Sequence, residues 1–291
     1  MVKATALHDD LPAVASGLPR WARAAVYAVL IAGAVVMVLP FIWMLSTACK
    51  PSVELSQLPV RFIPENPACM ENLRELYDKS GGFNRYLFNS ALLTAARVFG
   101  QLVTCSLAAY GFARFKFPGR DVIFALCLGL LMIPFQAIVV PEYILLRQLG
   151  WLNTYAALLI PGIFSAFALF LLRQAFLQIP IELEEAAFID GANPLQVLRH
   201  VTLPLSGPAL AAFAVITIQA AWNDFLFPLV VANRPDTRVV TIGISLLQGQ
   251  RDIPYNLMMM GSLLATVPML IAFLLLQRYF IEGVSMSGVK R

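Results

Sequence analysis

The segment ELEEAAFIDGANPLQVLRHVTLP, residues 182–204, lies between two long apolar runs at 155–178 and 205–232. It is too polar to enter the hydrocarbon core of a bilayer, and it is too regularly patterned to be a slack connection. Apolar runs of about 20 residues are typical of helices that cross a membrane. The sequence therefore predicts two membrane spans joined by a structured polar element.

The pattern inside this element predicts two short helices. Three glutamates stand in the opening turns of the first helix, where carboxylates favour the positive end of the helix dipole: Glu182, Glu184 and Glu185. Gly191 can end that helix in a left-handed conformation, Asn193 can cap the next one, and Pro194 suits its first position. We therefore expect a helix-turn-helix with its turn at Gly191.

Composition extends the membrane assignment to the whole chain. Of 291 residues, 59% are hydrophobic and 13% are charged, and the mean hydropathy is +0.74; soluble proteins reach roughly 45–50% apolar residues. Backbone groups in lipid must bond within their own segment, which makes the spans helical. The sequence predicts an all-α integral membrane protein whose transmembrane domain, residues 24–281, lies between tails at 1–23 and 282–291. Its six transmembrane helices are expected at 24–46, 87–113, 121–141, 155–178, 205–232 and 257–281.

Positive charge predicts the orientation. The short connection between the second and third runs carries three cations, and such charge marks the cytoplasmic side: Arg114, Lys116 and Arg120. Because the number of spans is even, both termini are expected in the cytoplasm. Two connections would then face outward and are polar enough to meet a partner: Thr47–Asn84, with a short helix at Met70–Lys79, and Asn233–Tyr255.

Other kinds of site find little support. The net charge of +4 is spread thinly, without the basic patch that binds nucleic acid. The cysteines show no metal-binding spacing, and for Cys49 and Cys69 in one outer connection we favour unpaired thiols over a disulfide. His8 lies in a polar tail, and His200 is expected to cap carbonyls or to face solvent. The chain contains no GxxxxGK[ST], HExxH or GxSxG sequence, so we expect no catalytic residue, no metal and no cofactor on it.

A family resemblance rests on Glu185-Ala186-Ala187, then Gly191 after three intervening residues, and Val201-Thr202-Leu203-Pro204 after nine more. This pattern resembles the coupling signature of ABC importer permeases. Weaker motifs in order along the chain resemble carbohydrate importers, and specifically the second, six-span membrane subunit of the maltose importer: Lys50-Pro51, Asn89-Ser90, Ala109–Arg114, Asn153-Thr154 and Trp222–Phe225.

The resemblance implies a type I ABC importer permease fold with a cytoplasmic coupling helix between spans four and five. In that family this helix sits in a cleft of a separate ATPase subunit and moves with it. Coupling roles are implied for Glu185, Ala186, Ala187, Asp190, Gly191, Leu203 and Pro204.

The same resemblance implies a location and partners. We expect the chain in the plasma (inner) membrane of a bacterium. Its expected partners are a second homologous permease subunit, two ATPase subunits that bind ATP and Mg²⁺, and an extracellular lipoprotein or periplasmic solute-binding protein. The implied solute is a sugar or a sugar-like molecule, with glycerophosphodiesters as the alternative. An ion-coupled secondary transporter is a further alternative, although it would need more intramembrane ionisable groups. A membrane scaffold would leave residues 182–204 without a purpose.

Polar residues inside the predicted spans are candidates for the solute path. Arg97 lies mid-span, where a charge costs about 2.5–3.5 kcal/mol on insertion scales, so it is expected either in a structural ion pair, for instance with the partner subunit, or in contact with solute. In the fifth span, the Asp224 carboxylate can accept hydrogen bonds from a sugar beside Asn223, while the Trp222 indole stacks on it. A packing role competes for these residues. Kinks are expected at Pro134, Pro161, Pro228 and Pro268.

Overall fold

The computed structural model describes residues 19–59, 61–248 and 254–288, and within those ranges the chain is helical and contains no strand. This confirms the predicted all-α class. His8 and most of the predicted N-terminal tail lie outside the described residues. The elements are α1 (Arg20–Ala48), α2 (Ser52–Leu55), α3 (Cys69–Ser80), α4 (Phe83–Arg114), α5 (Arg120–Gly129), η1 (Leu130–Met132), α6 (Phe135–Gln148), α7 (Tyr155–Leu159), α8 (Ala166–Leu177), α9 (Ile181–Ile189), α10 (Pro194–Val197), η2 (Leu198–Thr202), α11 (Leu203–Leu205), α12 (Gly207–Trp222), α13 (Leu226–Val231), α14 (Val240–Gln248) and α15 (Tyr255–Gly288).

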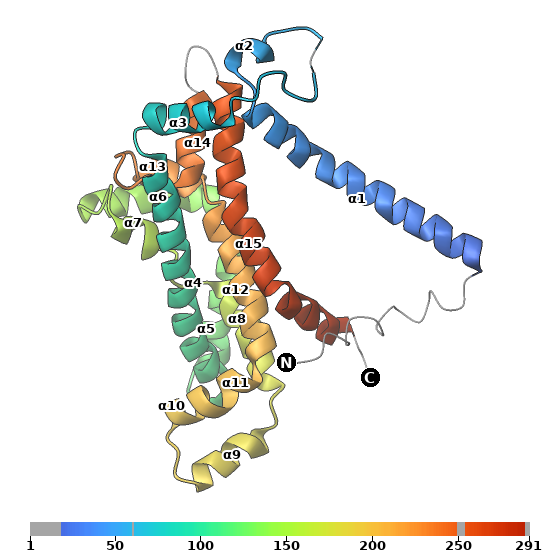
Figure 1. Cartoon of the computed structure of the whole chain (residues 1–291). Helices are drawn as coiled ribbons and strands as arrows, with labels where there is room; N and C mark the ends of the chain where they lie inside the picture. The colour runs from blue at the N-terminus through green and yellow to red at the C-terminus, as the bar shows by residue number, and fades with distance from the viewer. Residues whose placement is uncertain (1–18, 60, 249–253, 289–291) are drawn as a thin grey trace.

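Within the part of the chain that the structure describes, three helices are long and apolar enough to cross a membrane: α1, α4 and α15. They correspond to the first, second and sixth predicted spans. In the bundle, α12 packs against both α4 and α15, whereas α1 diverges from it (Figure 1), and most apolar side chains of α1 are therefore exposed. The helix α15 runs through Pro268 without a break and ends at Gly288, beyond the predicted boundary at 281.

The third, fourth and fifth predicted spans are broken. The pair α5–η1 and α6 meets at an angle of 102°, with Pro134 at the break. The helices α7 and α8 are separated by the irregular segment 160–165, which contains Pro161, and α12 and α13 by residues 223–225. Three bent helix pairs could each count as one span: α5–η1 with α6, α8 with α9, and the segment 194–205 with α12. Together with the three long helices they give up to six candidates among the described residues, although the last two pairs do not coincide with the predicted fourth and fifth spans. The kinks at the first two prolines are confirmed, and the number of six spans stays a prediction.

The break at 160–165 is bonded to α4. Gln101 Nε2 donates to the Gly162 carbonyl at 2.6 Å, and Thr104 Oγ1 donates to the Ile163 carbonyl at 2.7 Å. A Cβ at Gly100 would come within 2.5 Å of the Ile163 side chain, so the absence of a side chain there lets the break approach α4. Irregular backbone at membrane depth requires such partners, and α4 supplies them.

Cys49 and Cys69 form a disulfide, so the prediction of unpaired thiols is wrong. The connection folds back after α1, since the Ala68 amide donates to the Cys49 carbonyl at 2.8 Å. Asn72 Nδ2 holds the return by donating to the carbonyls of Ala48 and Lys50, each at 2.8 Å. The sequence separation of the two cysteines did not reveal this return. The helix predicted at Met70–Lys79 is confirmed as α3.

The connection predicted from Asn233 to Tyr255 contains a helix, α14, that the sequence analysis missed. Its apolar stretch is too short to span and was therefore assigned to a loop. Val240 and Leu247 are buried in a cluster with Tyr86 and Leu257. A Cβ at Gly243 would lie 2.4 Å from the Tyr86 ring, so this helix packs tightly on α4.

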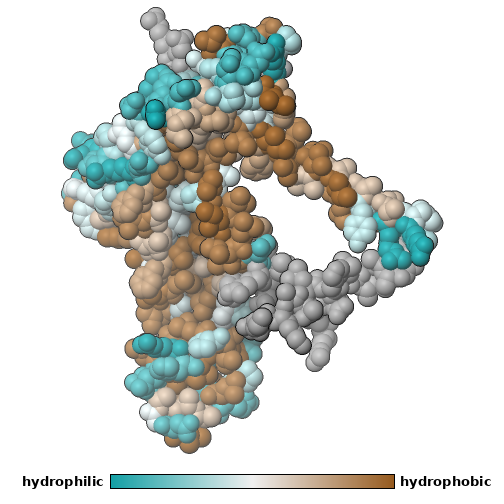
Figure 2. Space-filling view, in the orientation of Figure 1, coloured by the Kyte–Doolittle hydropathy of each residue, from teal (hydrophilic) through white to brown (hydrophobic). Residues whose placement is uncertain are grey.

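Polar elements gather at the two ends of the bundle. We call the end that carries α9 and α10 the α9 end, and the end that carries α2, α3 and α14 the α3 end. Hydrophilic side chains gather at both ends, mixed with apolar ones at the α9 end, and apolar side chains predominate in the middle of the visible face (Figure 2). This distribution matches a bundle that crosses a bilayer from one polar end to the other.

Candidate coupling and solute sites

The turn after α9 has the predicted geometry. Gly191 adopts φ +89°, in the left-handed region that favours glycine. Its amide donates to the Phe188 carbonyl at 3.0 Å, and the Ala192 amide donates to the Ala187 carbonyl at 3.0 Å. These two bonds form a Schellman motif, which satisfies the last carbonyls of the helix. The left-handed end predicted for Gly191 is confirmed.

The second short helix begins with a capping box. Asn193 Oδ1 accepts from the Gln196 amide at 3.0 Å, and Gln196 Oε1 accepts from the Asn193 amide at 2.8 Å. Pro194 occupies the first turn, as predicted. After Val197 the helix widens into a single π turn, which the sequence analysis did not predict. His200 lies there with Nδ1 3.0 Å from the Gln196 carbonyl, as expected for a capping role.

The predicted coupling residues surround an exposed tip. Glu185, Ala186 and Asp190 are exposed, whereas Ala187 packs against the buried cluster around Phe176. The apolar side chains of α9 are exposed as well, most of all Ile189 at 86%. Of the remaining predicted residues, Leu203 is partly buried and Pro204 is exposed. An apolar tip on a polar end is typical of a surface that another protein covers.

A buried ionic cluster lies directly behind this tip. Glu184 is 1% exposed, and its Oε1 accepts from Arg114 Nε at 3.0 Å and from Thr202 Oγ1 at 3.1 Å. Arg114 Nη2 also donates to the carbonyls of Phe176 and Ile179, at 2.8 and 2.9 Å. The cluster joins the ends of α4 and α8 to α9 and η2. This cluster was not predicted, because the local pattern indicates only a helix-dipole role for Glu184 and a topological one for Arg114.

Arg97 and Asp224 form an ion pair, with Arg97 Nη1 3.3 Å from Asp224 Oδ2. The expected ion pair of Arg97 is therefore present within this chain. The side chains are 28% and 25% exposed, and they line a cavity of about 430 Å³ together with Gln101 and Glu142. A Cβ at Gly162 would come within 2.7 Å of Arg97 Nε, so the glycine leaves room for the guanidinium. Glu142 was not among the predicted candidates.

Trp222 and Asn223 belong to a different cavity. Trp222 is 6% exposed and its Nε1 donates to the Ala265 carbonyl at 3.1 Å, so the packing role describes it. Asn223 is exposed and donates to the Gln219 carbonyl at 2.9 Å. Both line a space of about 540 Å³ between α12, α14 and α15, with Thr241 and Thr266. The four predicted path residues are thus divided between two cavities.

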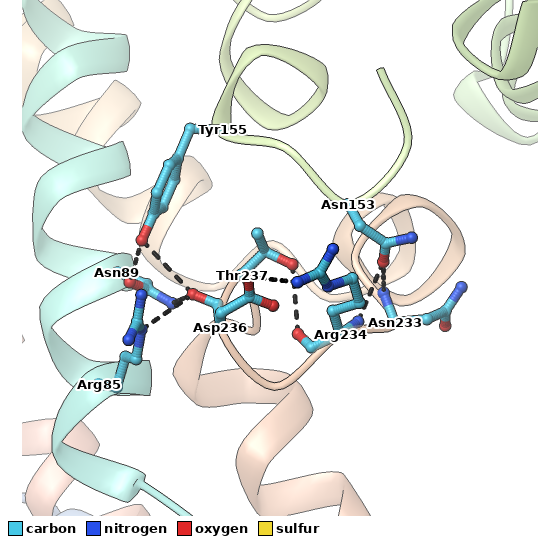
Figure 3. Close-up of polar contacts among 8 residues, drawn as sticks. All are labelled: Arg85, Asn89, Asn153, Tyr155, Asn233, Arg234, Asp236 and Thr237. Atoms are coloured by element: carbon cyan, nitrogen blue, oxygen red, sulfur yellow. Dashed lines mark hydrogen bonds and ion pairs between the residues drawn. The ribbon is translucent and has the colours of Figure 1, made fainter. Parts of the chain in front are cut away.

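At the α3 end, the segment that precedes α14 is held in place (Figure 3). Asn89 Nδ2 donates to the carbonyls of Asp236 and Arg238 at 3.0 and 2.8 Å, and Tyr155 OH donates to Asn89 Oδ1 at 2.8 Å. Figure 3 also shows Asn153, at φ +61°, whose Oδ1 accepts from the amides of Asn233 and Arg234 at 2.7 and 3.0 Å. The weak motif residues Asn89 and Asn153 therefore act as clamps on this segment.

Among the described residues, no group of three or more His, Cys, Asp or Glu side chains is placed to hold a metal ion. The residues with clear spatial organisation are the exposed α9 tip, the ionic cluster behind it, and the two cavities in the middle of the bundle.

Comparisons with known proteins cover most of the chain. A family model described as binding-protein-dependent transport system inner membrane component matches residues 101–285. The chain is 35% identical over 269 residues to the trehalose/maltose transport system permease protein MalG of Thermococcus litoralis, covering 90% of this chain and 96% of that protein. It is 34% identical over 264 residues to the sn-glycerol-3-phosphate transport system permease protein UgpE of Rhizobium meliloti, covering 87% and 93%.

A solved structure has the same fold. A chain in the crystal structure of a bacterial ABC transporter involved in the import of the acidic polysaccharide alginate aligns with a TM-score of 0.79, covering 90% of this chain and 99% of that one. The sequence identity is 24%, so this likeness concerns the fold alone. The predicted type I importer permease architecture is confirmed at the level of the fold.

Proposed function

The chain belongs to the family of binding-protein-dependent transport system inner membrane components, and from that premise we propose that it passes a neutral or amino sugar through an ATP-driven importer. As a permease it carries the solute, and ATP with Mg²⁺ would be bound by two separate ATPase subunits. A second homologous permease subunit would complete the pathway. An extracellular lipoprotein or periplasmic solute-binding protein would deliver the sugar.

The observation that carries this proposal is the exposed α9 tip. Glu185, Ala186 and Asp190 are exposed beside Ile189, and Gly191 closes the tip in the left-handed conformation that the coupling signature needs. We expect this tip to bind in a groove on an ATPase subunit. Leu203 and Pro204 would belong to the segment 194–205, which connects the tip to α12.

The proposed orientation puts the α9 end in the cytoplasm of a bacterial cell and the α3 end outside. The Cys49–Cys69 disulfide supports this orientation, because disulfides persist in oxidising compartments and are rare in the cytosol. The cations of the connection between α4 and α5 support it from the other end. The clamped segment 233–238 would then face the solute-binding protein.

The cavity around Arg97 bears on the alternative of glycerophosphodiesters. A phosphate would need a free cation, but the Arg97 guanidinium is engaged by Asp224 at 3.3 Å. Glu142 adds a second carboxyl group to the same lining. With two carboxyl groups and one guanidinium, this cavity favours neutral or cationic solutes and repels anionic ones.

The proposed cycle is alternating access. ATP binding closes the ATPase pair, which displaces α9 and changes the angles at the breaks in the third, fourth and fifth spans. The cavities then face outward to accept the sugar, and ATP hydrolysis returns them inward. Broken helices suit such motion, because the breaks concentrate backbone rotation in a few residues.

Reconstitution tests the proposal. The complete complex in vesicles should accumulate labelled neutral sugar when ATP is present on the ATPase side and the solute-binding protein on the other. Excess sn-glycerol 3-phosphate should compete poorly. Uptake that runs on an H⁺ or Na⁺ gradient without the ATPase subunits would instead identify a secondary transporter.

A further inference from the structure

The helix α9 is attached to the bundle mainly through one side chain. Most of its residues are exposed, and among the described residues every side-chain hydrogen bond from α9 to another element is made by Glu184. Ala187 adds an apolar contact. A force applied at the tip therefore reaches the bundle by two routes: along the backbone into α10, and through the Glu184 carboxylate.

The backbone route is compliant. It passes the left-handed turn at Gly191, then the π turn at 198–202, and then an angle of 80° between the segment 194–205 and α12. Each of these features departs from regular α-helix. Displacement of the tip can be absorbed at each of them before it reaches α12.

The side-chain route is short and stiff. Arg114 Nε bonds Glu184 at 3.0 Å, and the same guanidinium holds two carbonyls at the end of α8. The Arg114 side chain is 10% exposed and Glu184 is 1% exposed, so solvent cannot easily replace these bonds. The planar guanidinium can hold three acceptors at fixed angles, which an ammonium group cannot do.

Arg114 lies at the end of one continuous helix, α4. The helix α4 runs without a break from Phe83 to Arg114, and it contains no proline. Arg97 lies on the same helix, about 25 Å from Arg114 at the rise of an α-helix. Gln101 and Thr104, between them, hold the break at 160–165. A displacement of Arg114 is thus delivered to the Arg97 cavity and to the broken fourth span together.

We propose that Arg114 and Glu184 form a transmission joint through which α9 moves α4 and α8 directly, so that the Arg97 cavity responds to the ATPase subunits by this route. The inference rests on the proposed function. It assigns Arg114 a positioning role, and it makes α4, rather than α12 alone, an output of the coupling helix.

The test is Arg114→Lys in the complete reconstituted complex. Lysine keeps the positive charge that sets topology but cannot hold three acceptors. We expect ATP hydrolysis to stay within about twofold of the unsubstituted complex while sugar uptake falls about tenfold, so that the ATP consumed per sugar rises several-fold. Arg120→Lys is the matched control, since Arg120 is partly exposed, pairs with its neighbour Asp121 and otherwise makes only a long bond to the Phe115 carbonyl at 3.5 Å among the described residues.

An unchanged ratio of ATP to sugar in Arg114→Lys would overturn the joint. Equal loss of hydrolysis and uptake with normal ATPase binding would also overturn it, because a merely structural contact predicts that result. Failure of the unsubstituted complex to transport with ATP would instead refute the proposed function.

A distance measurement keeps the proposal testable if the variant does not assemble. Spin labels on Glu182 of α9 and Leu107 of α4, both exposed, are placed in an otherwise unsubstituted complex that lacks the free Cys105 and Cys127 thiols. The joint predicts the same label separation without nucleotide and in the vanadate-trapped state. A shift of several ångströms would show that α9 moves independently of α4, and the proposal would fail.

Discussion

Two ion pairs of this molecule differ in how far they are buried. At the α9 end, Arg114–Glu184 is almost fully buried, with 10% and 1% of the side chains exposed, and both partners have further hydrogen bonds. In the middle of the bundle, Arg97–Asp224 is exposed by 28% and 25% to a cavity. A pair sealed from solvent fixes two elements to each other, whereas a pair that lines a cavity can meet a solute. The difference in burial is the reason we propose a positioning role for the first pair and a place near the solute for the second.

The largest effect is expected from Glu184→Ala, which tests whether the buried ion pair stabilises the α9 end. The substitution leaves the Arg114 guanidinium buried without its counter-charge, which costs about 3–5 kcal/mol. We expect a marked fall in the thermal stability of the detergent-purified permease, measured by unfolding without ATPase subunits. Glu185→Ala, at the exposed neighbouring position, should change stability by less than about 0.5 kcal/mol. Equal losses in the two variants would show that the buried cluster does not support the α9 end.

The next effect concerns the turn that presents the tip. Gly191→Val places a β-branched residue at φ +89° and should cost about 1–3 kcal/mol of local strain. We expect ATP hydrolysis to continue while sugar uptake in vesicles falls about tenfold, so that hydrolysis is no longer coupled to uptake. Gly191→Asn is the control, because asparagine tolerates the left-handed region. If valine and asparagine behaved the same way, the conformation of residue 191 would not matter for coupling.

The features that the sequence predicted correctly are local ones. The turn at Gly191, the cap at Asn193 and the helix at Met70–Lys79 were predictable because their signals are local: a glycine, a capping side chain and a helical pattern within a few residues. The same holds for the breaks at Pro134 and Pro161.

The contacts that were missed join distant parts of the chain. Glu184 meets Arg114 across 70 positions, and Asn89 meets Asp236 across 147. Cys49 and Cys69 became neighbours only because the chain returns after α1. The helix α14 was not predicted because its apolar stretch is too short to cross a membrane, and its packing partners on α4 are distant in the sequence. No local pattern reports such pairings, so the predicted path residues could not be divided between their two cavities.

A smaller effect is expected at the cavity pair. Gly162→Ala would place a Cβ within 2.7 Å of Arg97 Nε, so the flexible guanidinium must move and the ion pair must lengthen. We expect the apparent Michaelis constant for uptake to change a few-fold, with little change in ATPase binding. Gly111→Ala, on α4 where a Cβ would meet nothing within 4 Å, is the control. An unaltered Michaelis constant would mean that the Arg97 position does not affect the solute.

The smallest effect on stability, and the most informative for the solute, is expected from Glu142→Gln. Glu142 is not part of an ion pair among the described residues, and its replacement keeps the Arg97–Asp224 contact while removing one carboxyl charge from the cavity. Stability should change by less than about 1 kcal/mol, as for other partly exposed charges. Competition by an anionic sugar analogue should strengthen several-fold relative to a neutral sugar, measured as the ratio of inhibition constants. Asp224→Asn removes one charge as well but frees Arg97 from its partner, so it should strengthen anionic competition further. If neither substitution altered the ratio, the charge of this cavity would not select the solute, and the cavity beside Asn223 would become the better candidate for the path.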